Sequence, residues 1–209
     1  MERRALSRRR PWHTVDTVYV GWWLTRHRAV GRMAGQYDGR RSRADREGGA
    51  VDLVVRAATL DDYEAMTSLY TETDRLNHEW LPQLFPPVTG PIRSRDYVAR
   101  QLADPNVRYL VAELAGRIVG LLLAIHHDVP STPWFHARRY VEVQDLTVDS
   151  AARRRGVGRL LIDATEAWAR ERGATSIDLT VIEANENALR FYERLGFSTR
   201  SRRMTRIVS

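Results

Sequence analysis

The sequence predicts an α/β domain with a mixed β-sheet, and three patterns support this class. Residues 108–125, RYLVAELAGRIVGLLLAI, hold two apolar runs around an Ala115-Gly116 turn, which is typical of an antiparallel hairpin. Residues 156–173, GVGRLLIDATEAWARERG, repeat apolar side chains along one helical face between two strand-like segments. A helix in that position connects parallel strands, so both kinds of pairing are expected in one sheet.

The domain begins with a strand and a helix. DLVVRAA, residues 52–58, is typical of a strand. Thr59 with Asp62 then offers a near capping box, because each side chain can satisfy a free backbone N–H at a helix start. We expect this helix to run through about Tyr70 and on toward Leu76.

A loop, a short helix and three strands follow. Residues 81–91 contain four prolines and predict a loop. Residues 94–102 suit a short helix, which the turn residues DPN close before the hairpin. A second proline-containing loop, DVPSTP, then leads to the strand YVEVQDLTV, residues 140–148.

The C-terminal part completes a crossover. The helix 156–173 ends at a glycine, and SIDLTVI, residues 176–182, predicts the next strand. Residues 187–196 predict a helix that ends at Gly196, and residues 197–208, FSTRSRRMTRIV, predict a last strand. The expected order is strand, two helices, three strands, helix, strand, helix, strand.

A basic extension precedes this domain. Residues 1–51 have twelve Arg and five acidic side chains, and the other 158 residues carry 21 basic and 21 acidic ones. The net charge of +7 therefore belongs to the extension, and a neutral domain argues against nucleic-acid binding as its main activity. We expect residues 1–51 to be disordered and residues 52–209 to form the folded domain, with Met33 as a second candidate for the translation start.

Composition excludes several kinds of chemistry. The chain has no cysteine, which removes disulfides, thiolate nucleophiles and thiolate metal sites. The apolar run 18–24 is too short to span a bilayer, and no secretory signal is evident, so we expect a cytoplasmic protein without a membrane partner. Adjacent His126 and His127 point to opposite faces of a strand, so we expect no metal site.

The segment ARRRGVGRLL, residues 152–161, offers an anion site. A Gly-x-Gly turn that enters a helix lets backbone N–H groups converge, and the helix dipole adds positive potential. The third glycine of the Rossmann fingerprint and the Gly-Lys-Ser/Thr of a P-loop are both missing. A tight turn before a packed helix is the structural alternative. The chain contains Arg but no Lys, so a single arginine is weaker evidence for a functional role than usual.

Residues 143–197 resemble the GNAT superfamily of acyl-CoA-dependent N-acyltransferases. Two signatures carry the resemblance at family spacing. The R/Q-x-x-G-x-G/A pyrophosphate loop is matched by Arg153, Gly156 and Gly158. The N-x-x-A-x-x-F/L-Y-x-x-x-G-F segment is matched by Asn185, Ala188, Phe191, Tyr192, Leu195, Gly196 and Phe197.

The resemblance implies a GNAT fold and an acetyl-CoA site. The implied fold has a mixed sheet of six to seven strands, about four helices and a central parallel strand pair that splays apart. The implied cosubstrate is acetyl-CoA, with its pyrophosphate on the turn, its pantetheine on the preceding strand and Asn185 at the cofactor arm, where helix capping is the alternative. The residues concerned are Leu146, Thr147, Val148, Arg153, Arg154, Arg155, Gly156, Val157, Gly158, Arg159, Asn185 and Tyr192.

The resemblance also implies catalytic roles. Tyr192 occupies the position of the acid that protonates the departing thiolate, with packing beside Phe191 as the alternative. A general base must deprotonate the amine, and Glu142 and Asp145 are rivals, because strand alternation places them on opposite faces. Glu142 is preferred narrowly, because it lies at the offset of the glutamate base in the histone acetyltransferase branch.

The function expected from these residues is N-acetyl transfer from acetyl-CoA to an amine of an unidentified small molecule or protein. A catalytically silent acyl-CoA-binding or sensing module is one alternative. A nucleic-acid-associated protein acting through the basic extension is another. A homodimer is expected from the resemblance alone.

Overall fold

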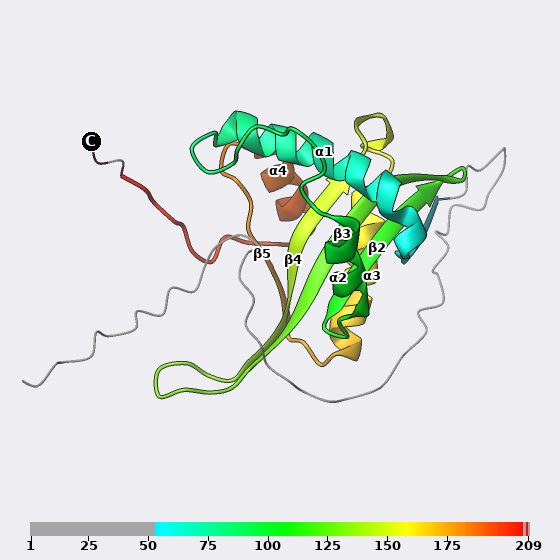
Figure 1. The fold of residues 1–209 in the computed structure, drawn as a ribbon. Helices are drawn as coiled ribbons and strands as arrows, with labels where there is room; N and C mark the ends of the chain where they lie inside the picture. The colour runs from blue at the N-terminus through cyan, green and yellow to red at the C-terminus, as the bar shows by residue number, and fades with distance from the viewer. Residues whose placement is uncertain (1–52, 207, 209) are drawn as a thin grey trace, which may run out of the picture. The chain divides into compact units, whose positions relative to one another are not determined.

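The computed structural model describes residues 53–206 and 208, so the expected extension 1–51 and Met33 lie outside the described residues. The described chain contains a five-stranded sheet in the order β1-β2-β3-β4-β5 (Figure 1). Neighbouring strands are antiparallel except for the parallel pair β4 and β5. The strands are β1 Leu53–Ala57, β2 Val107–Leu114, β3 Arg117–Val129, β4 Arg138–Val148 and β5 Ser176–Leu179.

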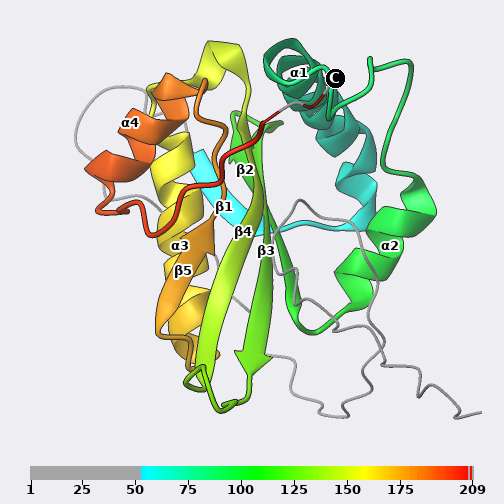
Figure 2. The same ribbon diagram turned by 90° about the vertical axis from the view of Figure 1, so that its left-hand side faces the viewer.

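Helices cover both faces of the sheet. Figure 2 shows α1 and α2 on one side and α3 and α4 on the other. Two short 3-10 turns, Leu60–Asp62 and Ser150–Ala152, precede α1 and α3. The four α-helices of the described residues are α1 Tyr63–Trp80, α2 Arg95–Ala103, α3 Val157–Glu171 and α4 Glu186–Arg194. This confirms the α/β class, the mixed sheet and the meander followed by a crossover.

The 3-10 turn Leu60–Asp62, which leads directly into α1, follows the expected capping chemistry. The Asp62 carboxylate accepts a hydrogen bond from the Thr59 N–H at 2.8 Å and from the Arg56 guanidinium at 2.8 Å. The helix continues past the expected Leu76 to Trp80. It ends there because Leu81 precedes a proline, which disfavours helical backbone.

Other local signals also agree with the sequence. The Ser94 hydroxyl caps α2 by accepting from the Tyr97 N–H at 3.2 Å. Ala115 and Gly116 have φ of 51° and 74°, as a two-residue hairpin turn requires. Among the described residues, no helix combines the length and apolar character needed to cross a bilayer.

Each face of the sheet has its own apolar core. Leu122, Ala124 and Val141 pack with Leu161 and Trp168 of α3 on one face. On the other face, the buried side chains of α1 and α2 pack against Tyr109, Val111, Leu121 and Leu123. Burying a leucine side chain stabilises the fold by about 1.5–3 kcal/mol, so these two cores fix both faces of the sheet against the helices.

The sheet is smaller than the six to seven strands expected. The predicted strand 197–208 is wrong, because no strand forms among residues 197–206. Residues 197–206 pair with no strand of the sheet. Phe197 packs against the core, and Arg200 lies 3.1 Å from Asp178 while Arg202 lies 3.5 Å from Glu183. The predicted strand 176–182 is also shortened to Ser176–Leu179.

Candidate active site

The glycine turn lies between β4 and α3. Gly156 is the N-cap of α3 with φ of 84°, and Arg154 also has positive φ at 63°. The Leu160 N–H donates to the Gly156 carbonyl at 3.0 Å, so amides ahead of Leu160 belong to the helix end that lacks intrahelical acceptors. No acidic residue occupies the first turn of α3. The turn therefore has the donors and the helix dipole of an anion site.

The two glycines of the turn are required for different reasons. Gly156 adopts a left-handed conformation that side chains disfavour, while a Cβ there would meet open space. A Cβ on Gly158 would lie 3.0 Å from the Phe191 ring, so Gly158 allows α3 and α4 to pack closely. The second glycine of the signature thus serves helix packing beside the turn.

The arginines of the turn differ in their contacts. The Arg153 side chain turns toward α1, where Nη2 lies 2.6 Å from the Glu72 carboxylate and Nε donates to the Val148 carbonyl at 3.1 Å. Arg159 lies 3.8 Å from Asp163, one helical turn along α3. Arg154 and Arg155 are exposed at the turn. Positive side chains therefore surround the turn, and one of them is held by α1.

A β-bulge in β4 changes which side chains share a face. Leu123 pairs with Asp145 and the next residue, Ala124, pairs with Val143, so Gln144 is an extra residue in β4. The extra residue reverses the alternation of side chains between the two faces of β4, so residues before and after Gln144 no longer follow one period of two. The expectation that Glu142 and Asp145 face opposite sides is therefore wrong.

Contacts on both sides of Gln144 show the shared face. Val143 packs in the core under α3, whereas Asp145 contacts Tyr70 of α1. Glu142 pairs with Ile125, and Ile125 lies on the face opposite to that of its neighbour Ala124, which packs under α3. Glu142 and Asp145 therefore both lie on the face covered by α1 and α2.

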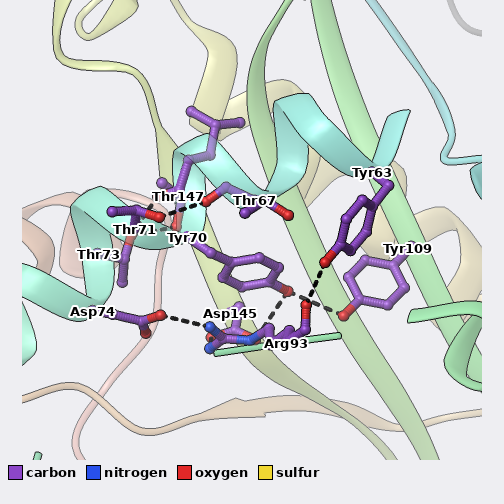
Figure 3. A network of polar contacts seen from close by, with 11 residues as sticks. Tyr63, Thr67, Tyr70, Thr71, Thr73, Asp74, Arg93, Tyr109, Asp145 and Thr147 are labelled. Atoms are coloured by element: carbon purple, nitrogen blue, oxygen red, sulfur yellow. Dashed lines mark hydrogen bonds and ion pairs between the residues drawn. The ribbon is translucent and has the colours of Figure 1, made fainter. Parts of the chain in front are cut away.

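Asp145 belongs to a polar network between β4, α1 and the loop before α2 (Figure 3). The Tyr70 hydroxyl donates to the Asp145 carboxylate at 3.2 Å and lies 3.1 Å from the Tyr109 hydroxyl. The Arg93 guanidinium is 3.5 Å from Asp145 and donates to Asp74 at 2.8 Å, and it lies over the Tyr70 ring. The side chains of Arg93 and Asp145 are 21% and 20% exposed, so solvent reaches the pair.

Burial and charge shift the acidities in this network. Burial raises the pKa of Asp145, although the Arg93 charge and the Tyr70 hydrogen bond oppose the rise. Burial, followed by the charge of Asp145, raises the pKa of Tyr70 well above its usual range. Burial alone would lower the pKa of Arg93, but nearby Asp145 and Asp74 outweigh it and raise that pKa. The network thus contains a carboxyl that takes up a proton more readily than an ordinary aspartate does.

Glu142 lies in a separate cluster. Its carboxylate is 3.1 Å from the His127 Nε2, and the His127 ring stacks on Tyr140 at 4.6 Å between centroids. His126 points to the opposite face, where burial lowers its pKa. Among the described residues no group of three His, Cys, Asp or Glu side chains could hold a metal.

The remaining predicted residues lie near the end of β4 and on α4. The Thr147 hydroxyl is 2.6 Å from the Thr73 hydroxyl of α1. The Asn185 side chain caps α4 by accepting from the Ala188 N–H at 3.1 Å. Leu146 and Val148 pack against the core under α3.

Tyr192 lies within reach of the Asp145 charge. Its ring makes edge contacts with Phe191 and Phe197 at 5.1 and 5.5 Å between centroids. Burial, and then the charge of Asp145, raise the pKa of Tyr192 well above its usual range. The fold therefore brings two of the three predicted catalytic residues into one electrostatic environment.

Sequence reasoning missed Arg93, Tyr70 and Asp74. Tyr70 and Asp74 are one helical turn apart on α1, so a polar stripe on that helix was the available signal. Arg93 lies in an irregular segment after the proline-rich loop, where no periodic pattern assigns a direction to a side chain. Its role in the network became visible only in three dimensions.

The fold places a glycine turn with backbone donors at the start of α3 and a half-buried carboxyl, Asp145, on β4. The acetyltransferase (GNAT) family matches residues 64–197, and the chain therefore belongs to this family. This confirms the resemblance seen in the sequence.

The known proteins to which the chain is similar include two acetyltransferases and one protein of known structure. The chain is 31% identical over 152 residues to an aminoalkylphosphonate N-acetyltransferase of Salmonella typhimurium, covering 73% of this chain and 89% of that protein. It is 36% identical over 105 residues to a mycothiol acetyltransferase of Propionibacterium freudenreichii, covering 50% of this chain and 32% of that protein. The BH1408 protein of Bacillus halodurans, solved as a tetramutant, shares the fold with a TM-score of 0.71 and 24% identity, covering 74% of this chain and 99% of that one.

Proposed function

We propose that this acetyltransferase moves an acetyl group from acetyl-CoA directly to an amine of a small molecule or protein. The observation that carries the proposal is the glycine turn at the start of α3, whose backbone donors suit a diphosphate, in a chain of the GNAT family. In this proposal the amides of Arg154 to Arg159 hold the diphosphate, while exposed arginine side chains screen its charge.

The end of β4 suits the pantetheine arm. Pairing of β4 with β5 runs only from Tyr140–Ser176 to Val143–Leu179, whereas β4 continues to Val148. The Asp149 N–H donates to Val119 of β3, so by alternation the N–H groups of Leu146 and Val148 face away from β3. We propose that the strands splay here and that one of these N–H groups polarises the thioester carbonyl.

Asp145 is our choice as general base, in place of the preferred Glu142. Burial raises its pKa, which makes it a better proton acceptor than an ordinary aspartate, and solvent reaches it. The amine nitrogen bonds to the acetyl carbon, its proton passes to Asp145 directly or through water, and the C–S bond breaks. Tyr192, whose phenol is protonated at neutral pH, then donates its proton to the departing thiolate, and the phenolate regains a proton from the Asp145 carboxyl through water.

The domain boundary completes the proposal. We propose that residues 1–51 lie outside the catalytic domain, because the family match begins at residue 64 and β1 begins at Leu53. Limited proteolysis of the full chain followed by mass spectrometry tests this boundary. The expected first stable fragment begins near residue 52, and an N-terminal segment as resistant as α3 would contradict it.

Calorimetry of the full chain with acetyl-CoA and CoA tests the function, followed by an acetyl-CoA consumption screen. The screen covers amino acids, polyamines, aminoalkylphosphonates, aminoglycosides and peptide N-termini. Binding with turnover of at least one amine class is expected. Absence of binding by folded protein would overturn the donor site, and binding without turnover would favour a silent acyl-CoA-binding module.

A further inference from the structure

Three consecutive residues of α1 contact three different parts of the proposed site. Glu72, the first of them, lies 2.6 Å from the Arg153 guanidinium, whose Nε donates to the Val148 carbonyl at the end of β4. The Glu72 side chain is 28% exposed, so the ion pair is partly shielded from water. This contact connects the glycine turn to α1.

The next two residues continue the connection. The Thr73 hydroxyl lies 2.6 Å from the Thr147 hydroxyl on β4. The Asp74 carboxylate accepts from Arg93 at 2.8 Å, and Arg93 in turn lies 3.5 Å from Asp145 (Figure 3). The same turn of α1 therefore contacts both the acyl-donor side and the proposed base.

We infer that residues 72–74 of α1 position both halves of the site through separate contacts, Glu72 acting on acyl-CoA binding through Arg153 and Asp74 acting on Asp145 through Arg93. Glu72 and Asp74 are positioning residues, since each acts through an arginine. Arg153 then mainly holds the turn in place. The backbone amides and the side chains of Arg154 and Arg155 contact the phosphate charges. The inference rests on the proposed function.

The two contacts act on different properties. Glu72 holds Arg153 at the start of the glycine turn, so removing the Glu72 charge makes the backbone amides that bind the diphosphate less well positioned. Asp74 competes with Asp145 for Arg93, and its negative charge also raises the pKa of Asp145. The charged and titratable groups around Asp145 are Tyr70 and Asp74 of α1, Arg93 before α2, Tyr97 of α2, Tyr109 of β2 and Tyr192 of α4.

Calorimetry with CoA tests the first contact on the full chain. Glu72→Gln is expected to weaken CoA binding about threefold to fivefold, as the loss of a partly exposed ion pair allows. In an Arg153→Gln background the same change should have no further effect. The matched control is Glu79→Gln on the same helix, because within the described part of the chain Glu79 pairs with the exposed Arg75 and not with the glycine turn. Equal CoA affinity of Glu72→Gln and wild type would overturn this half.

Carboxyl-carbon NMR titration tests the second contact and needs no acceptor. The Asp145 signal is identified by its loss in Asp145→Asn. In Asp74→Asn, which keeps an oxygen for Arg93, the Asp145 midpoint is expected to move to lower pH, while CoA affinity stays within twofold of wild type. An unchanged or raised midpoint would overturn the inference.

The outcomes separate this inference from the function on which it rests. Wild-type protein that binds no CoA refutes the proposed function. Wild-type protein that binds CoA, combined with variants that lose both properties together or neither, refutes the two separate contacts alone. Circular dichroism melting of each variant shows that a lost property does not come from unfolding.

Discussion

The Tyr70 hydroxyl of α1 donates a hydrogen bond at 3.2 Å to the Asp145 carboxylate of β4, a residue far away in the sequence. The β-bulge at Gln144 makes this contact, because it turns Asp145 toward α1. The contact has consequences for catalysis that are measurable once an acceptor is identified.

Asp145→Asn should lower kcat/KM by about 100-fold or more, the typical contribution of a general base. The pKa of Asp145 is raised, so the wild-type rate should fall with acid at a pH above the ordinary aspartate range. Steady-state kinetics across pH check both points. Glu142→Gln serves as the comparison, and a larger loss in that variant would return the base to Glu142.

Tyr192→Phe should lower kcat about 10- to 100-fold and leave CoA affinity unchanged, because only the proton donor is removed. The ring contacts with Phe191 and Phe197 do not involve the hydroxyl. Since burial raises the pKa of Tyr192, ionisation of this phenol should not limit the wild-type rate below pH about 10. Kinetics and CoA calorimetry provide the test, and full activity of the variant would exclude Tyr192 as the acid.

Gly156→Ala should lower the free energy of unfolding by about 1 kcal/mol, because alanine resists the φ of 84°. It should also weaken CoA binding about fivefold by displacing the donor amides. Gly116→Ala, with φ of 74° in the β2–β3 turn, is the matched control. Denaturant unfolding should show a similar loss in both, and CoA calorimetry should distinguish them; equal CoA affinities would refute the role of the turn.

Asp62→Asn should destabilise the domain by about 1–3 kcal/mol near neutral pH. The hydrogen bond from Arg56 lowers the pKa of Asp62, so the folded state favours the carboxylate. This contribution is present above the ordinary aspartate pKa and is lost as pH falls through the lowered folded value. Urea unfolding from pH 7 to pH 3 should therefore show the wild-type advantage shrinking in acid, whereas exposed Asp61→Asn should follow wild type throughout.

Local patterns were sufficient to predict most of the elements. The Thr59–Asp62 cap, the Ala115-Gly116 turn and the helix after Gly156 depend on neighbouring residues, and the structure has all three. The strand expected at 197–208 failed because a strand exists only with a partner, and partner choice is not a local property. The glycine turn could be predicted from the spacing of its residues, because, like the caps, it depends on residues that are neighbours in the sequence.

The sequence by itself determined the α/β class, the order of the elements up to α4, and the family, since these depend on periodicity and short motifs. Only the tertiary structure decided which side chains meet around Asp145. One inserted residue in β4 reverses the side-chain alternation, and Arg93 reaches Asp145 from an irregular loop. Contacts between residues far apart in the chain are fixed by packing of the whole domain, which no local pattern contains.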